Sequence, residues 1–217
     1  MSTPLLSLTD TRVLGVLVEK QRTVPDTYPL SLNALTAGCN QKTSRDPVLE
    51  IPEAEVQASI DRLRHESLVV ESSGGRVMRY AHNVERVLAL PGPAVVLLAV
   101  LMLRGAQTVA ELRANTDRMH RFADASTVEG YLQELAVREA GALVVELPRA
   151  PGSREARWMH LLSGPPPAGL EPRPPGMAVR HDEPGLADRV AALEDDIARM
   201  RAELAALSAA LREGGRD

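Results

Sequence analysis

Aromatic residues are scarce in this chain of 217 residues, which has one phenylalanine, one tryptophan and three tyrosines. A surface that stacks successive single-stranded bases on aromatic rings needs more of them, so the composition disfavours that class of nucleic-acid binding. A single cysteine, Cys39, excludes an internal disulfide and a cysteine-rich zinc site. We interpret it as a small buried side chain rather than a nucleophile.

Long apolar runs are also missing. The longest, from Ala94 to Leu103, has ten residues, whereas a membrane-spanning helix needs about 20. The first residues lack the basic segment and apolar core of a signal peptide. We therefore expect a cytoplasmic protein without a membrane partner.

Motifs that carry enzymatic chemistry are absent as well. The sequence has no glycine-rich nucleotide loop, no metalloprotease motif and no nucleophile elbow, and its five histidines are scattered. The sequence predicts that the protein is not an enzyme and needs no cofactor and no metal.

The remaining composition, 44% apolar and 25% charged, is typical of a globular protein. Hydrophobic spacing in the first region predicts three helices followed by two strands around a Ser-Ser-Gly-Gly turn. Thr9 is the expected cap of the first helix and Ser31 of the second. The expected elements are Thr9 to about Gln21, Leu32–Gly38, Pro52–Glu66, Leu68–Glu71 and Arg76–Ala81.

The second region repeats this order. Capping boxes at Thr108–Glu111 and Ser126–Glu129 predict the starts of its second and third helices. The closing strands of the two regions share a pattern of arginine, aromatic, any residue and histidine. The expected elements are Ala94–Arg104, helices from Thr108 and Ser126, and strands Leu143–Leu147 and Ala156–Leu162.

Three helices followed by a hairpin is the order of a winged helix. The sequence therefore predicts a mainly α (α+β) fold with tandem winged-helix domains at residues 1–90 and 91–163. Residues 164–184, which contain seven prolines, are predicted to be a linker. Residues 185–213 are predicted to form a C-terminal coiled-coil helix.

Several segments resemble the YceH family of uncharacterised bacterial proteins, over roughly residues 8–164. The segments are Val18 to Thr36, Cys39 to Lys42, Arg45 to Val48, Leu103 to Gly105 and Arg154 to Trp158. The most specific are Tyr28 to Leu35 and Cys39 to Lys42. The resemblance implies a tandem winged-helix fold, in agreement with the order of elements. It implies no biochemical activity and no functional residue.

Winged helices commonly bind duplex DNA, with the helix after the turn in the major groove and the wing on the phosphates. Here the third helix of the first region opens with Glu50, Glu53 and Glu55, which would repel phosphates. Hydrogen-bond donors gather instead in the preceding loop, and cations in the second turn and wing. The candidate nucleic-acid-binding residues are Asn40, Gln41, Lys42, Ser44, Arg45, Arg118, Arg121, Arg149 and Arg154.

Two interpretations of these residues stay open. Either they contact backbone phosphates, and the protein is a non-enzymatic regulator or scaffold on duplex DNA, or they build turns and salt-bridged surfaces. In the second case the protein is a protein–protein adaptor without DNA affinity. Net charges of −1 for residues 1–90 and zero for residues 91–163 agree with an adaptor.

An unbroken heptad pattern in the last region predicts a parallel homodimer. The β-branched residues Val190 and Ile197 take position a, and Leu186 and Leu193 take position d, the distribution that favours two strands. The alternatives are a helix that folds back on its own domains or binds another protein. The dimerisation residues are Leu186, Val190, Leu193, Ile197, Met200, Leu204, Leu207 and Leu211.

Overall fold

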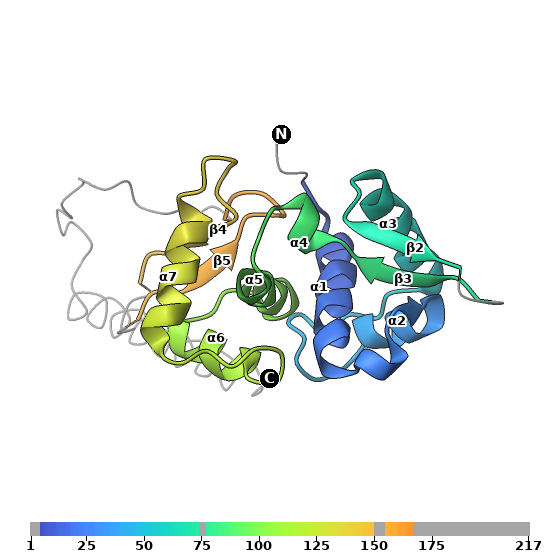
Figure 1. Cartoon of the computed structure of the whole chain (residues 1–217), viewed down its shortest axis with the longest axis horizontal. Coiled ribbons are helices and arrows are strands. Elements are labelled where there is room, and N and C mark those ends of the chain that lie inside the picture. The colour runs from blue at the N-terminus through green and yellow to red at the C-terminus, as the bar shows by residue number, and fades with distance from the viewer. Residues whose placement is uncertain (1–4, 74–76, 150–154, 167–217) are drawn as a thin grey trace, which may run out of the picture. The chain divides into compact units, whose positions relative to one another are not determined.

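The first half of the protein, shown in a computed structural model (Figure 1), begins with α1 (Leu8–Thr23). The structure describes residues 5–73, 77–149 and 155–166. A 3₁₀ turn, η1 (Pro25–Thr27), ends the α1 segment. It is followed by β1 (Leu30–Ser31), α2 (Leu32–Cys39), α3 (Glu53–His65), β2 (Val69–Ser72) and β3 (Arg79–His82). The three strands form an antiparallel sheet in the order β1-β3-β2.

The second half repeats three helices and a hairpin after a short connecting helix. Its strands pair antiparallel, with Val144 opposite His160 and Glu146 opposite Trp158. The elements are α4 (Val84–Val87), α5 (Gly92–Arg104), α6 (Val109–Thr116), α7 (Ala125–Ala136), β4 (Val144–Glu146) and β5 (Trp158–His160). Within the described residues, the chain is therefore of mixed α+β class, with seven α-helices and small antiparallel sheets.

Equivalent hydrogen bonds support the repeat. Tyr80 of β3 pairs with Leu30, directly before the Ser31 cap of α2, and Trp158 of β5 bridges to Gln107, directly before the Thr108 cap of α6. The arginine that precedes each aromatic residue also makes an equivalent hydrogen bond to a backbone carbonyl. Arg79 Nη1 donates to Pro29 O at 2.8 Å, and Arg157 Nη1 donates to Ala106 O at 2.6 Å.

Two predicted helix caps are wrong. The cap of α1 is Ser7, whose hydroxyl accepts from Asp10 N while Asp10 bonds back, so Thr9 lies inside the first turn. The cap of α7 is Asp124, whose carboxylate accepts from Thr127 N at 2.8 Å, so Ser126 also lies inside its helix. In both cases a better-placed side chain begins the helix earlier, because an N-cap needs its oxygen near the third backbone amide.

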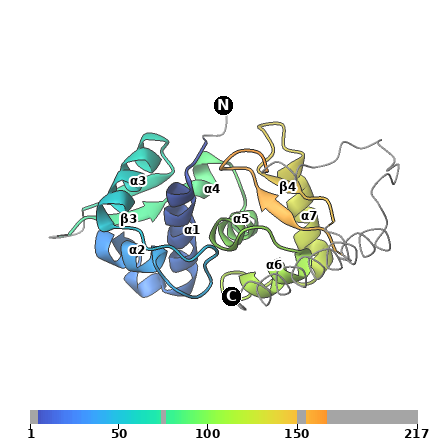
Figure 2. The same ribbon diagram turned by 180° about the vertical axis from the view of Figure 1, so that it is seen from behind.

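The core is continuous between the halves because α5 packs against both. Residues Ala94 to Leu103 are all buried, and α5 contacts α1 on one side and α6 and α7 on the other (Figures 1 and 2). A β-carbon added to Gly15 of α1 would lie 2.9 Å from Leu103 Cγ. The absence of a side chain at Gly15 therefore lets α1 and α5 approach closely. No helix among the described residues is long and apolar enough to cross a membrane.

His82 and His160 occupy equivalent ends of β3 and β5, as the repeat predicts. Their side chains are buried, and the Nδ1 atom of each has no hydrogen-bond partner within the described chain. Burial lowers the pKa of His82 to about 4, and it lowers the pKa of His160 to about 4 as well. Both imidazoles are therefore neutral in the folded protein at pH 7.

We expect the free energy of unfolding to fall as the pH drops from about 6.5 to about 4. In that window the unfolded chain binds protons at both histidines, while the folded chain does not. Each histidine should account for roughly 2–4 kcal/mol of the loss. Urea unfolding at a series of pH values measures it.

The variant His160→Leu should flatten this dependence, since the new side chain does not titrate. His65→Leu is the matched control, because His65 is exposed on α3. A pH dependence that is the same in His160→Leu as in the wild type would contradict the assignment.

Candidate nucleic-acid interface

The loop between α2 and α3 contains five of the nine candidate nucleic-acid contacts. The first, Asn40, forms a two-way bridge across the loop: its Nδ2 donates to Ile51 O at 2.9 Å, and its Oδ1 accepts from Ile51 N at 2.8 Å. The second, Gln41, accepts at Oε1 from Lys20 and Arg45. Both amides therefore serve to shape the loop.

Arg45 is the clearest departure from the prediction. Its side chain is fully buried, and it donates through Nη1 and Nη2 to the two carboxylate oxygens of Glu19 at 3.1 and 2.7 Å. It also donates through Nε and Nη2 to Gly38 O at 3.2 and 3.0 Å. Because these hydrogen bonds occupy its guanidinium nitrogens, Arg45 has no donor left for a DNA phosphate. Its role is therefore structural.

The pKa of Glu19 shows the strength of this pairing. Burial of the Glu19 carboxylate favours its protonated form, but the hydrogen bonds and charge of Arg45, followed by those of Lys20, outweigh burial. As a result, the pKa of Glu19 lies below its ordinary value. The carboxylate stays ionised and holds Arg45 in place.

A second buried arginine, Arg12 of α1, completes the arrangement. It is fully buried and donates to Cys39 O at 3.1 Å and to Pro47 O at 2.6 Å. Burial, then the charge of Arg45, lowers the pKa of Arg12. The two guanidinium groups thus bind carbonyls at the C-terminal end of α2, where a helix leaves its carbonyls without internal partners.

The remaining loop candidates are Lys42 and Ser44. Ser44 Oγ accepts from Arg104 Nη2 at 2.7 Å, which ties the loop to the end of α5. Lys42 is exposed and has no partner among the described residues. Of the five loop candidates, only Lys42 presents a free positive charge to solvent.

The helix that follows the loop, α3, has an acidic exposed surface. Its exposed acids include Glu53, Glu55 and Asp61. Its two arginines are paired with carboxylates: Arg62 lies 2.8 Å from Asp10, and Arg64 lies 2.9 Å from Glu71. The charge available to a partner of α3 is negative.

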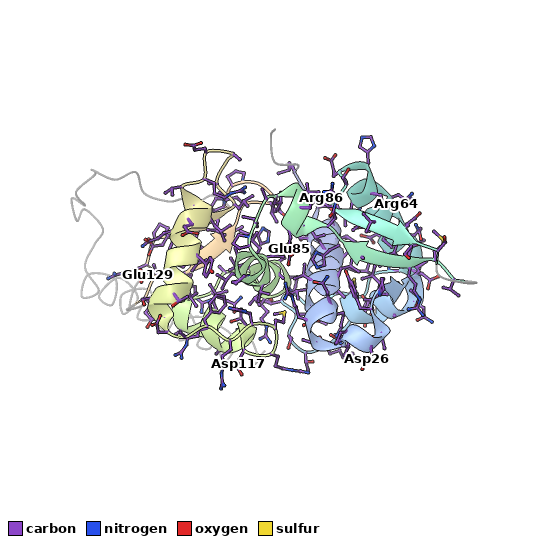
Figure 3. All side chains as sticks on the ribbon, in the orientation of Figure 1. Asp26, Arg64, Glu85, Arg86, Asp117 and Glu129 are labelled. Atoms are coloured by element: carbon purple, nitrogen blue, oxygen red, sulfur yellow. The ribbon has the colours of Figure 1, made fainter. Side chains whose placement is uncertain are left out.

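In the second half, α7 is the corresponding helix and contains no lysine or arginine. It carries two exposed acids, Glu129 and Glu134. Figure 3 shows Glu129 on the outer side of α7, pointing away from the molecule. Neither third helix therefore offers a positive surface.

The other four candidates lie in the loop after α6 and in the connection between β4 and β5. Arg118 and Arg149 are exposed and have no partner among the described residues. Arg121 is 86% exposed and lies 3.4 Å from Asp117. Arg154 lies outside the described residues, as do all eight predicted dimerisation residues from Leu186 to Leu211.

The candidates thus divide into structural and exposed groups. Asn40, Gln41, Ser44 and Arg45 stabilise the loop, while Lys42, Arg118, Arg121 and Arg149 are exposed.

Sequence reasoning missed Arg12 and Glu19. Their spacing of seven residues along α1 puts them on one helical face, which was the available signal. Within the described residues, no group of three His, Cys, Asp or Glu side chains is placed to hold a metal ion.

Comparisons with known proteins give a consistent result. Residues 6–153 match the model of the family described as "protein of unknown function, DUF480". A UPF0502 protein of Dechloromonas aromatica is 60% identical over 205 residues, which cover 94% of this chain and 96% of the relative. A UPF0502 protein of Methylibium petroleiphilum is 62% identical over 173 residues, which cover 77% of this chain and 74% of the relative. Neither name describes an enzymatic activity.

We expect Arg45→Ala to lower the free energy of unfolding by about 3–5 kcal/mol, because it leaves the Glu19 carboxylate buried without its main partner. Lys42→Ala, three residues away and exposed, is the control and should change stability by less than about 0.5 kcal/mol. Urea unfolding of both variants at pH 7 tests this. Equal effects of the two variants would show that Arg45 does not stabilise the fold.

Proposed function

The chain belongs to the DUF480 family, and from that premise we propose that it is a non-enzymatic adaptor which binds other proteins through two winged-helix domains. The sequence left DNA contact and protein contact open. The charges on the third helices favour protein contact. The proposal rests on that observation and on the repeated order of elements.

The winged-helix part of the proposal is supported by the position of the short strands. In each half, the chain just before the second helix pairs with the last strand, through Leu30 and Tyr80 in the first half and Gln107 and Trp158 in the second. A hairpin follows the third helix in both halves. This order of elements is the one expected of a winged helix, in which the second and third helices lie on either side of a turn. On this basis the proposal assigns α3 and α7 to the positions of recognition helices.

The charge of α3 and α7 carries the functional proposal. A duplex partner needs cations on or beside these helices, because phosphate contacts supply most of the non-specific affinity for DNA. Both helices instead present carboxylates, and the arginines of α3 are neutralised by Asp10 and Glu71. A protein surface with basic or neutral side chains is a better match.

The first hairpin gives independent support. The side chains of Val70, Val77 and Met78 are 45%, 58% and 42% exposed. Val70 lies on β2, and Val77 and Met78 directly precede β3. Exposed apolar side chains at a wing are suited to contact with another protein.

DNA binding remains the second candidate because three of the candidate cations are exposed and have no ion-pair partner among the described residues. Lys42, Arg118 and Arg149 have no partners among the described residues and lie in the two turn regions and the second wing. They are the groups through which a phosphate backbone would be contacted.

Fluorescence anisotropy with a random duplex at low salt distinguishes the two candidates. We expect no saturable binding by the wild type at micromolar concentration. We expect Glu50→Lys with Glu53→Lys to produce binding, since both acids are exposed beside the N-terminus of α3. That binding should weaken with salt, with a slope of about 0.9 for each phosphate that the new lysines neutralise and up to about 2 in total.

The matched control is Asp26→Lys with Glu139→Lys, which changes the net charge equally at exposed positions outside the third helices. It should not produce comparable binding. If the wild type binds duplex DNA with a steep salt dependence that Lys42→Ala with Arg118→Ala removes, the adaptor proposal fails and the second candidate replaces it.

For the C-terminal region we propose a homodimer, on the heptad pattern alone. Ile197→Asp should convert a dimer into a monomer in sedimentation at micromolar concentration, because a charge at position a cannot be buried in the seam. Ala202→Asp, at the outward position f of the same heptads, is the matched control and should stay dimeric. A wild type that sediments as a monomer at high concentration would remove the proposal.

A further inference from the structure

A polar hollow of about 310 Å³ lies between the loop that follows α2 and the end of α5. Its walls come from both halves of the protein, since the loop belongs to the first half and α5, α6 and β5 belong to the second. Asp46 N donates to Leu103 O at 2.8 Å and fixes the loop against α5. The side chains that the argument uses are Ser44, Asp46, Arg104, Glu111, Asn115 and Arg157.

Most charges around the hollow are neutralised within the chain. Arg45 is paired with Glu19, and Arg157 Nη2 lies 2.8 Å from Glu111 Oε1. Two opposite charges are left. Arg104 and Asp46 both line the hollow, yet neither forms an ion pair within 4.0 Å, with the other or with any further residue that the structure describes.

Arg104 is half-buried and uses one nitrogen, Nη2, on the hydroxyl of Ser44 at 2.7 Å. The rest of its guanidinium fork is not engaged by described residues, although a partly desolvated cation gains from an anionic partner. Asn115 donates through Nδ2 to Gln107 Oε1 at 2.6 Å, which leaves its own Oδ1 as an acceptor at the same hollow.

Two residues next to Arg104, one along the chain and one across a hydrogen bond, have a positive φ. Gly105, which ends α5, has φ 72° and ψ −157°, a region that only glycine adopts readily. Ser44, the hydrogen-bond partner of Arg104, has φ 60°. The guanidinium group is therefore positioned by a constrained chain before any ligand arrives, which reduces the entropy that binding would cost.

We propose that the hollow binds a small zwitterion of the free α-amino acid class. Its carboxylate pairs with the Arg104 guanidinium, and its ammonium group donates to Asp46 and Asn115. A simple anion would meet the carboxylates of Asp46 and Glu111, and a simple cation would meet Arg104 and Arg157. Only a ligand with both charges satisfies both unpaired groups. The volume is at the lower end for small-molecule sites, as a ligand of this size requires.

The site is independent of the adaptor function, because none of these residues lies on α3, on α7 or in the first hairpin. A ligand held by both Asp46 and Arg104 connects the two halves. Binding should therefore stabilise the folded chain as a whole.

Thermal unfolding of the full chain tests the proposal. The twenty standard amino acids are added singly at millimolar concentration, with acetate, phosphate and methylamine as probes that carry charge of one sign only. At least one amino acid should raise Tm by about 3–6 °C at ten times its Kd. Acetate, phosphate and methylamine at the same concentration should each raise Tm by less than a third as much.

Asp46→Asn and Arg104→Gln should each abolish the shift, measured against the Tm of the same variant without ligand. Asp46 is exposed, so its variant stays folded and keeps the test valid if Arg104→Gln does not fold. Arg86→Gln, at an exposed arginine on α4, is the matched control and should keep the full shift. The proposal is overturned if no amino acid shifts Tm, if acetate or phosphate acts as strongly as the best amino acid, or if Asp46→Asn keeps the shift.

Discussion

Two buried guanidinium groups meet at the C-terminal end of α2, where the backbone carbonyls have no partners inside the helix. Arg12 reaches them from α1 and Arg45 from the loop that follows α2, and Glu19 neutralises Arg45. Since breaking a buried pair is far more costly than losing an exposed one, these contacts determine the path of the loop. The position of the loop then determines where α3 begins and where Ser44 and Asp46 meet the end of α5.

Contacts of the same kind engage several other arginines of the described residues in backbone hydrogen bonds. Arginine forms several directed hydrogen bonds at once, so it is suited to join separate backbone segments. In this chain Arg79, Arg138 and Arg157 each donate to a carbonyl at least 50 residues away in sequence. The charge at the third helix of each half is therefore set by the exposed acids of α3 and α7 and by the ion pairs of Arg62 and Arg64, rather than by the number of arginines in the chain.

Much of the fold could be predicted from local patterns. Periodicity located the six principal helices and both hairpins, and the Ser31 and Thr108 caps were identified correctly because each is followed by a clear helical pattern. The elements η1, β1 and α4 have two to four residues, too few for periodicity to reveal them. The candidate site was harder to predict. The local sequence indicates an exposed loop cation at Arg45, whereas its burial depends on Glu19, 26 residues earlier, a contact that no local pattern encodes.

Close packing of α1 against α5 at Gly15 has a mechanical consequence. A helix buried on all sides cannot act as a hinge, since rotation about it would expose apolar side chains to water. Rotation of the loop that follows α2 relative to the loop that follows α6 would therefore disrupt the buried contacts of α5 with α1, α6 and α7.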